Sequence, residues 1–485
     1  FYRRAVADPG LSLHIYTALC LEVPTPAKGI EGNLAGPIVQ RLFGDYEELA
    51  FMAPLRKGTL PANIQISELY FKAGAMKAVP GAQQSYISSN YTHIARDMFN
   101  AGANVMVQLV AARQTPDGLS VSLSCNPDLA LEMMDKLHAS DRRHITIGQV
   151  HDDLPFMQND AEVGVGAFDL LVSNPQYNKS LFAVPNATVP LQDYATALHA
   201  STLVADGGTL QIGIGALGDA VAHSLILRQR HNRQYREAVQ ALSREKTVVA
   251  EDGGPFDQGL YVSTEMFVNG MLHLIENAVV KRKVYDHLAL QRGINAGLIS
   301  NRVDAQLYDF CRSQGVMPAR LDQTSLQALR YWGIVAESTT LEGDSLCFAS
   351  LVLPNEMDHP QVRDAVLAQA GGRELRHGRI LHGGFFLGPR DFYEKLRNLD
   401  AAGQEQICMT GVRRTNQLLL NYDLYCAQRQ KARFINTGMM VTLTGAVASD
   451  ALEDGTAISG VGGQYNFVAM AHDLPGARSV LCIRS

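Results

Sequence analysis

The chain has 485 residues, which exceeds one ordinary hydrophobic core and predicts two or three domains. A hydrophobic content of 46% and a charged content of 19% describe a packed globular protein and exclude an intrinsically disordered one. The formal net charge of −6 gives no electrostatic reason to expect nucleic acid or an anionic membrane as a partner.

The sequence contains no apolar run long enough to span a bilayer and no signal-peptide pattern at its start. Its seven cysteines are scattered without C-x-x-C spacing, which predicts reduced thiols in a cytoplasmic protein and neither a zinc site nor disulfides. The chain opens without Met and closes on the strand-like run 479–483, so we expect both ends to be incomplete.

Strand and helix patterns alternate over the first 190 residues. Asp117-Gly118 predicts a turn, and Ser88, Ser89 and Asn90 supply N-cap residues for a helix that ends at Asn100. Predicted strands cover 11–23, 104–110, 119–125 and 169–173, the first two as buried strands, and a second helix covers 128–138. This alternation predicts an α/β domain with a largely parallel sheet, ending near 186–193.

A glycine-rich turn, Gly213-Ile214-Gly215-Ala216-Leu217-Gly218, follows a predicted strand at 209–212 and precedes a predicted helix at 219–227. Such glycines allow a ligand to approach the backbone, and the helix start offers free N–H groups to an anion. The turn matches G-x-G-x-x-G, but a dinucleotide site needs a second strand that ends in an acid about 20 residues later. A basic helical pattern stands there instead, so a nicotinamide site remains only an alternative.

Four arginines of that helical pattern are expected to form a solvated helix face: Arg228, Arg230, Arg233 and Arg236.

Glu265 directly follows the β-prone run 260–264 and precedes Met266, Phe267 and a predicted turn at Asn269-Gly270. A carboxylate at the end of such a strand, among bulky apolar neighbours, is partly desolvated, which raises its pKa and makes its ionised form a better nucleophile. The alternative is a structural glutamate that caps the next helix or pairs with an arginine.

The remaining sequence offers helical patterns at 305–312 and 325–332 without assignable chemistry, and a strand with a glycine-rich loop at 380–390. His377 and His382, beside glycine turns, are expected to be packing residues. Asn436 precedes a second glycine-rich loop at 458–464. Nucleophile-elbow, phosphate-loop and zinc-protease motifs are absent from the sequence.

Four segments appear in a fixed order: DGGTLQIGIGALGDAV from Asp206, STEMFVNG from Ser263, INTGMMVTLTG from Ile435 and SGVGGQYNFV from Ser459. Together they resemble the acetyl-CoA hydrolase / CoA-transferase family, which includes acetate, butyrate and 4-hydroxybutyrate CoA-transferases. The resemblance implies two α/β domains with mainly parallel sheets, at 1–192 and 193–485, an insertion at about 288–376, and an active site in the cleft between the domains. It also implies a homodimer or tetramer.

The resemblance further implies a role for each segment. Glu265 falls on the catalytic glutamate, and the Asn436 amide on a position near the acyl carbonyl. Coenzyme A, as the acyl-CoA substrate, would contact two loops and one further residue: Gly213, Ile214, Gly215, Ala216, Leu217, Met439, Gly460, Gly462 and Gly463. No metal is expected. The family also suggests that the stretches 228–257 and 288–376 are insertions.

We therefore expect an enzyme that moves CoA between a short-chain acyl-CoA and a small carboxylate through a mixed acyl-glutamyl anhydride and a glutamyl-CoA thioester. Hydrolysis of acetyl-CoA through the same anhydride is the other form of this expectation. Two alternatives remain: a nicotinamide-dependent oxidoreductase that uses Gly213–Gly218, and a non-catalytic CoA-binding protein. A protein that only binds CoA would not need a nucleophile such as Glu265, which argues against the second alternative.

Overall fold

The computed structural model describes residues 1–24, 29–184, 188–243 and 253–484, and this part of the chain divides into two compact units. The first unit contains 1–281, 381–420 and 431–485, and the second contains 282–380 and 421–430. The insertion expected at 288–376 lies within the second unit. The boundary expected near 186–193 falls inside the first unit and remains a prediction; part of it, like part of 228–257, lies outside the described residues.

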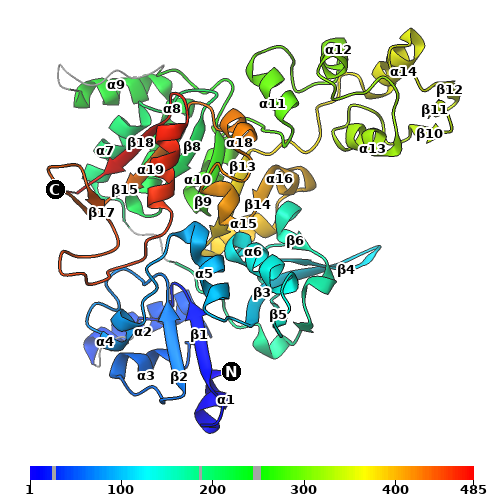
Figure 1. The fold of residues 1–485 in the computed structure, drawn as a ribbon. Coiled ribbons are helices and arrows are strands. Elements are labelled where there is room, and N and C mark those ends of the chain that lie inside the picture. The colour runs from blue at the N-terminus through cyan, green and yellow to red at the C-terminus, as the bar shows by residue number, and fades with distance from the viewer. Residues whose placement is uncertain (25–28, 185–187, 244–252, 485) are drawn as a thin grey trace. The chain divides into compact units, whose positions relative to one another are not determined.

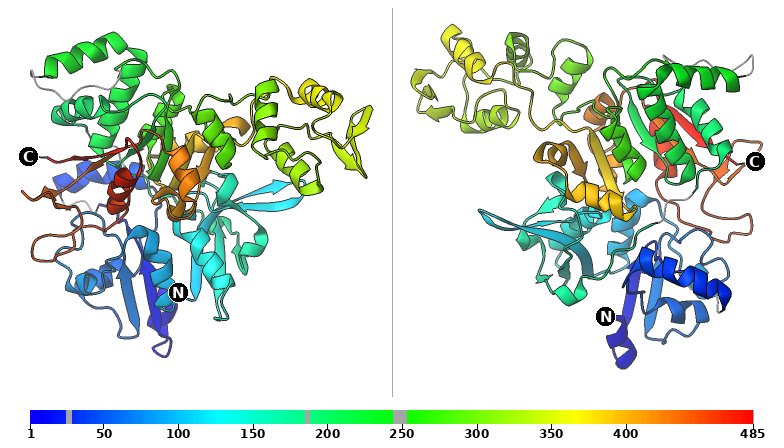
Figure 2. Two further views of the ribbon diagram at one scale, coloured as in Figure 1. Left: turned by 45° about the horizontal axis from the view of Figure 1, so that its top comes forward. Right: turned by 180° about the vertical axis from the view of Figure 1, so that it is seen from behind.

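A six-stranded sheet in the order β14-β13-β9-β8-β15-β18 forms the centre of the first unit, and all its pairings are parallel. Helices α7 (Leu191–Ser201) and α8 (Ala216–Arg230) cover one face of this sheet and α19 (Gln464–Asp473) covers the other (Figures 1 and 2). The strands are β8 (Thr209–Ile212), β9 (Tyr261–Phe267), β13 (Leu381–Phe386), β14 (Ile407–Met409), β15 (Arg433–Thr437) and β18 (Arg478–Cys482). The predicted α/β class with mainly parallel sheets is confirmed.

A five-stranded sheet, in the order β6-β4-β3-β5-β7, lies in the N-terminal part of the same unit. Its strands are β3 (Val105–Thr115), β4 (Gly118–Ser122), β5 (Ile145–Val150), β6 (Glu162–Val163) and β7 (Leu170–Val172). Thr115 pairs with Gly118, whose φ of +121° suits only glycine, so the turn predicted at Asp117-Gly118 is confirmed.

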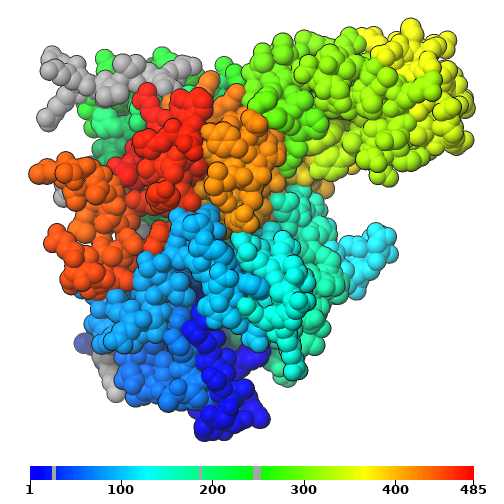
Figure 3. Space-filling view, viewed as in Figure 1, coloured from blue at the N-terminus to red at the C-terminus, as the bar shows by residue number. Residues whose placement is uncertain are grey.

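The two strands predicted as buried differ from expectation. β1 (Leu13–Thr17) is five residues long and pairs with β2 (Ile64–Glu68) in a separate two-stranded sheet. The side chains of β1 are only partly buried or exposed. β3 is longer than predicted, and its Val107 side chain is 54% exposed. In Figure 3 the N-terminal segment, in blue, and the segment around residues 100–170, in cyan, both lie at the surface of the face that is shown.

Short helices complete the first unit: α1 (Tyr2–Ala7), α2 (Ile30–Phe43), α3 (Met52–Lys57), α4 (Pro80–Gln84), η1 (Tyr91–His93), α5 (Ile94–Asn100), α6 (Pro127–His138), α9 (Asn232–Leu242), α10 (Asn269–Glu276), α15 (Arg390–Arg397), α16 (Ala401–Gln406) and α17 (Val412–Thr415). The Asn90 side chain accepts the N–H of Thr92 at 3.1 Å and so caps η1, which leads directly into α5, the helix predicted to end at Asn100. No helix of the described chain is long and apolar enough to cross a membrane.

The second unit has its own hydrophobic core, which includes Leu307, Leu326 and Val362. Its elements are α11 (Leu288–Asn295), α12 (Ala305–Ser313), α13 (Gln323–Tyr331), α14 (Pro360–Ala370), α18 (Tyr422–Gln428) and the antiparallel strands β10 (Thr340–Glu342), β11 (Ser345–Phe348) and β12 (Leu351–Pro354). His377 stacks on Tyr331 with ring centroids 3.8 Å apart, which agrees with its expected packing role.

The expectation that Arg228 lies on a solvated helix face is wrong. Its side chain is fully buried, and its guanidinium donates to the carbonyl oxygens of Gly254 (2.7 Å) and Val204 (2.5 Å) and lies over the Phe256 ring. The helical pattern alone gave no sign of these partners, because they come from segments before and after the helix. Arg233 does lie on the exposed face of α9, near Glu237.

Replacing Arg228 by alanine is expected to lower the free energy of unfolding by about 2–4 kcal/mol, because buried carbonyl groups lose a charged donor and a cavity remains. Arg233→Ala is the matched control on the solvent side, and its effect should stay within about 0.5 kcal/mol. Urea denaturation followed by circular dichroism measures both, and equal effects of the two variants would contradict the structural role assigned to Arg228.

Candidate active site

Glu265 is the fifth residue of β9, inside the strand rather than just after it. The strand extends beyond the predicted end because β13 continues to pair with it, Phe385 with Met266 and Phe386 with Phe267. The turn predicted at Asn269-Gly270 is also wrong, since these residues open helix α10 with Val268 as its N-cap.

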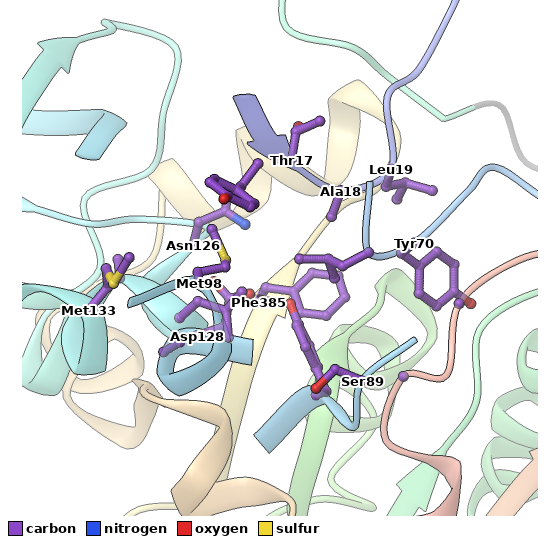
Figure 4. A pocket seen from close by; sticks show the side chains of 18 of the residues that line it. Thr17, Ala18, Leu19, Tyr70, Ser89, Met98, Asn126, Asp128, Met133 and Phe385 are labelled. Atoms are coloured by element: carbon purple, nitrogen blue, oxygen red, sulfur yellow. Dashed lines mark hydrogen bonds between the residues drawn. The ribbon is translucent and has the colours of Figure 1, made fainter. Parts of the chain in front are cut away.

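Glu265 lines a cavity of about 1460 Å³ within the first unit. The walls come from the loop after β8, from β13 and β15, from the glycine-rich loop before α19, and from β1, β3, α5 and α6 of the N-terminal part. Side chains from several of these elements surround the pocket in Figure 4, among them Tyr70, Met98, Asp128 and Phe385. Residues of both predicted domains therefore line one cavity.

The Glu265 carboxylate is held by an amide that the sequence did not reveal. Nδ2 of Asn416 donates to Oε2 of Glu265 at 2.6 Å. Asn416 is fully buried directly after α17, and its Oδ1 accepts from the Thr415 hydroxyl at 2.9 Å, which fixes the orientation of the amide. No motif of the sequence surrounds Asn416, so only the fold brings it to Glu265.

The second glycine-rich loop packs directly against the same carboxylate. A Cβ added to Gly463 would overlap Oε2 of Glu265 and Nδ2 of Asn416, and one added to Gly462 would lie 3.6 Å from Oε1. The close approach explains the need for glycine at 463, and Gly462 has φ +55°, a conformation that also favours glycine. Gly460, Gly462 and Gly463 all line the cavity.

Two tyrosines of the N-terminal part pack against this loop. A Cβ on Gly460 would overlap the Tyr70 ring, and the backbone N–H of Tyr91 donates to the Gly462 carbonyl at 3.3 Å. The Tyr91 hydroxyl donates to Asp128, a 6% exposed residue in the first turn of α6. Sequence reasoning missed this group as well, because its residues lie in three separate elements.

Burial raises the pKa of Glu265 to about 7, with a smaller contribution from the negative charge of Asp128, and the Asn416 hydrogen bond opposes the rise. Burial likewise raises the pKa of Asp128 to about 6, while the hydrogen bond from Tyr91 opposes it. Glu265 is therefore close to half-ionised at neutral pH and poorly solvated, which suits a carboxylate nucleophile.

The first glycine-rich loop reaches the cavity only at its start. Gly213 and Ile214 line it, and the Gly213 N–H donates to the Ile435 carbonyl at 2.8 Å. Gly215 is the N-cap of α8, and Ala216 and Leu217 begin that helix without lining the cavity. A Cβ on Gly218 would overlap the Gly213 carbonyl, so this glycine allows close helix–strand packing.

Asn436 and Met439 differ in their positions. Asn436 lines the cavity, but its amide is paired reciprocally with Gln211, with both hydrogen bonds at 2.9 Å. Met439 does not line the cavity, and its N–H bonds the Ala448 carbonyl at 3.0 Å. His382 is buried away from the cavity against the Tyr261 hydroxyl at 2.7 Å, as expected for a packing residue.

A dinucleotide site finds little support in the described chain. Helices α8 and α9 fill the described chain where a dinucleotide site would need its second strand, and the next strand, β9, begins only at Tyr261. Within 1–24, 29–184, 188–243 and 253–484, no group of three His, Cys, Asp or Glu side chains is arranged to hold a metal.

Replacing Glu265 by glutamine is expected to stabilise the fold at alkaline pH. A carboxyl whose pKa rises from about 4.5 unfolded to about 7 folded contributes a penalty that is absent at low pH and grows as pH rises between the two values. At pH 8 Glu265→Gln should be more stable by on the order of 2 kcal/mol, and at pH 4.5 the difference should vanish. Urea denaturation at both pH values measures it.

The control for this variant is Glu237→Gln, a change of the same chemistry on the exposed face of α9. This control should give no pH-dependent gain. A gain at pH 8 no larger for Glu265→Gln than for Glu237→Gln would show that the carboxylate is well solvated.

Residues 388–485 match the family described as the acetyl-CoA hydrolase/transferase C-terminal domain. The match includes Asn416, Asn436 and the second glycine-rich loop. The sequence matches none of the curated proteins with which it was compared.

Several solved structures resemble the whole chain. A point mutant of RipA aligns at 18% identity over 99% of this chain and 80% of its own, with a TM-score of 0.55. RipA from Yersinia pestis aligns at 16% identity over 96% of this chain and 77% of its own, with a TM-score of 0.50. A 4-hydroxybutyrate CoA-transferase from Porphyromonas gingivalis aligns at 13% identity, over 99% and 79%, but its TM-score of 0.46 carries no argument.

At such identities a structural likeness establishes the fold and leaves the activity open. The family resemblance inferred from the four ordered segments is confirmed by the match of the last fifth of the sequence. Residues 388–485 thus match the C-terminal domain of the acetyl-CoA hydrolase/transferase family, in a chain that has the fold seen in RipA.

Proposed function

We propose that this protein transfers CoA between a short-chain acyl-CoA and a carboxylate through a covalent glutamyl-CoA thioester on Glu265. Hydrolysis of acetyl-CoA by way of the same anhydride is the closest variant of this proposal. The observation that carries it is the carboxylate of Glu265, bonded to the Asn416 amide at 2.6 Å and packed against the Gly463 backbone in a large cavity.

The chemistry proceeds through covalent steps on one carboxylate. A Glu265 oxygen attacks the thioester carbon, the C–S bond breaks, and CoA thiolate leaves an acyl-glutamyl anhydride. The thiolate then attacks the glutamyl carbonyl, which releases the acyl group as a free carboxylate and leaves glutamyl-CoA. An acceptor carboxylate reverses both steps, forming a new anhydride and then a new acyl-CoA with free Glu265.

The groups around Glu265 suit the charge that develops in these steps. Each attack turns a carbonyl oxygen negative, and a prearranged donor can stabilise it by about 3 kcal/mol. The Asn416 amide, which already bonds a Glu265 oxygen, is the donor best positioned for an oxyanion on the glutamyl carbonyl. The pair with Gln211 uses one of the two N–H groups of the Asn436 amide, so the other N–H can still serve the acyl carbonyl in the predicted role.

Both glycine-rich loops are proposed to contact CoA. Gly460, Gly462 and Gly463, with Gly213 and Ile214, line the cavity, where side chains on the glycines would narrow the path of the pantetheine arm. Binding of this non-reacting arm can be used to drive the reacting groups toward the transition state. Four further predicted residues lie outside the cavity lining and would act by supporting the loops: Gly215, Ala216, Leu217 and Met439.

Transfer and hydrolysis differ in whether water reaches the anhydride before CoA and an acceptor do.

A cytoplasmic location and a homodimer or tetramer also remain part of the proposal. The nicotinamide alternative is less well supported, because in the described chain helix α9 lies where a strand ending in the ribose-binding acid would be needed. A protein that only binds CoA would have no use for a desolvated carboxylate with a fixed amide donor.

Intact-protein mass spectrometry after mixing with propionyl-CoA, followed by peptide mapping, tests the covalent intermediate. A CoA-sized adduct on the peptide that contains Glu265 is expected, and Glu265→Ala should bind CoA but form no adduct and show no turnover. Unchanged activity in Glu265→Ala would refute the proposal. Turnover with and without acetate then separates transfer from hydrolysis.

Replacing Asn416 by alanine should lower kcat by about 100-fold, because the donor to the developing oxyanion is lost. Asn436→Ala is the comparison, since its amide faces Gln211, and its effect should be several-fold smaller. Steady-state kinetics with propionyl-CoA and acetate measure both variants. A greater loss for Asn436→Ala would return the oxyanion role to Asn436.

A further inference from the structure

Part of the cavity beside Glu265 has an apolar wall with one buried acid in it. We call this part the acyl subsite and define it by Tyr91, Met98, Asp128, Leu129, Met133 and Phe385. Its residues come from η1, α5, α6 and β13, and Figure 4 labels Met98, Asp128, Met133 and Phe385 among the side chains that line the pocket. The Tyr91 and Phe385 rings pack edge to face with centroids 6.0 Å apart.

Tyr91 connects Asp128 to the glycine-rich loop that packs against the Glu265 carboxylate. The Tyr91 hydroxyl donates to Asp128, and its backbone N–H bonds the Gly462 carbonyl, in the loop that packs against Glu265. The charge of Asp128 also raises the pKa of Glu265, as expected for two acids in one poorly solvated site. An acyl chain attached to Glu265 and directed into this subsite would therefore extend toward Asp128.

None of the described residues that define the acyl subsite has a basic side chain that could balance a further negative charge. Among the described residues that line it, the carboxylates are Glu265 and Asp128, and the basic side chains are Arg4 and His14. Arg4 has a 77% exposed side chain, 3.8 Å from Asp8. His14 bonds the Ser67 hydroxyl at 2.8 Å, and burial lowers its pKa, which disfavours its charged form.

We propose that Asp128 is a specificity-determining residue that restricts the substrates to uncharged acyl groups and excludes dicarboxylic ones. The inference rests on the proposed CoA transfer or hydrolysis at Glu265. The reacting carboxyl meets the Asn416 amide and the glycine backbone, whereas a second carboxylate at the far end of the acyl chain would lie beside Asp128 without a cation. Repulsion between like charges and desolvation both oppose that arrangement.

The test compares butyryl-CoA with succinyl-CoA, which has a carboxylate where butyryl-CoA has a methyl group. Acyl-CoA consumption in the presence of acetate follows either transfer or hydrolysis. The native protein should favour butyryl-CoA in kcat/KM by at least about 100-fold, because the second carboxylate of succinyl-CoA would lose its water without gaining a cation and would also be repelled by Asp128. Asp128→Asn keeps an oxygen for the Tyr91 hydroxyl, removes the charge, and should reduce this preference about 10-fold.

Glu68→Gln is the matched control, because Glu68 is 3% exposed, accepts the Cys20 N–H at 2.9 Å, and does not line the cavity. It should leave the ratio of the two kcat/KM values unchanged. A purely structural role for Asp128 would lower both activities and leave their ratio as it was. Met98→Lys, which adds a cation to the acyl subsite, should shift the ratio toward succinyl-CoA even if Asp128→Asn folds poorly.

Equal use of succinyl-CoA and butyryl-CoA by the native protein would overturn the inference and leave the proposed function intact. The same holds if the ratio stays constant in Asp128→Asn and Met98→Lys while turnover persists. Absence of turnover and of a Glu265 adduct with any acyl-CoA would instead refute the proposed function, and this inference with it.

Discussion

One hydrogen bond, from the Asn416 amide to the Glu265 carboxylate, determines what the cavity can do. Burial alone would favour the protonated, unreactive acid, since removing a carboxylate from water opposes its ionisation. A single amide donor at 2.6 Å offsets part of that effect, and the pKa settles at about 7. More donors would stabilise the ion and weaken it as a nucleophile, whereas none would leave it protonated.

The parallel sheet explains how residues so far apart in sequence reach one point. In a parallel sheet the carboxyl ends of all strands lie at the same edge. Gly213 follows β8, Glu265 lies toward the end of β9, and Asn436 is the fourth residue of β15, and these strands are neighbours in the order β9-β8-β15. Asn416 arrives on the other side of Glu265, after β14 and α17.

The sequence predicted the parts of this arrangement that have a local signal. A strand followed by glycines and a helix predicted β8, its loop and α8, and the ordered segments pointed to Glu265 and to the second glycine-rich loop. Asn416, Asp128 and Arg228 were missed or misjudged, because a buried polar side chain is defined by its partners, and those partners lie in other elements. Periodicity predicts which face of an element is buried, but not which polar group of another element that face will contact.

Gly463 also constrains the direction of the chemistry. Its backbone lies so close to Oε2 of Glu265 that a Cβ would overlap the oxygen, and Asn416 occupies the same side. An acyl group or CoA can therefore join the carboxylate only from the side open to the cavity. On the proposed mechanism acyl group and thiolate use that side in turn, so the first product must leave before the acceptor enters. Ping-pong kinetics would then follow from the packing of one glycine against one carboxylate.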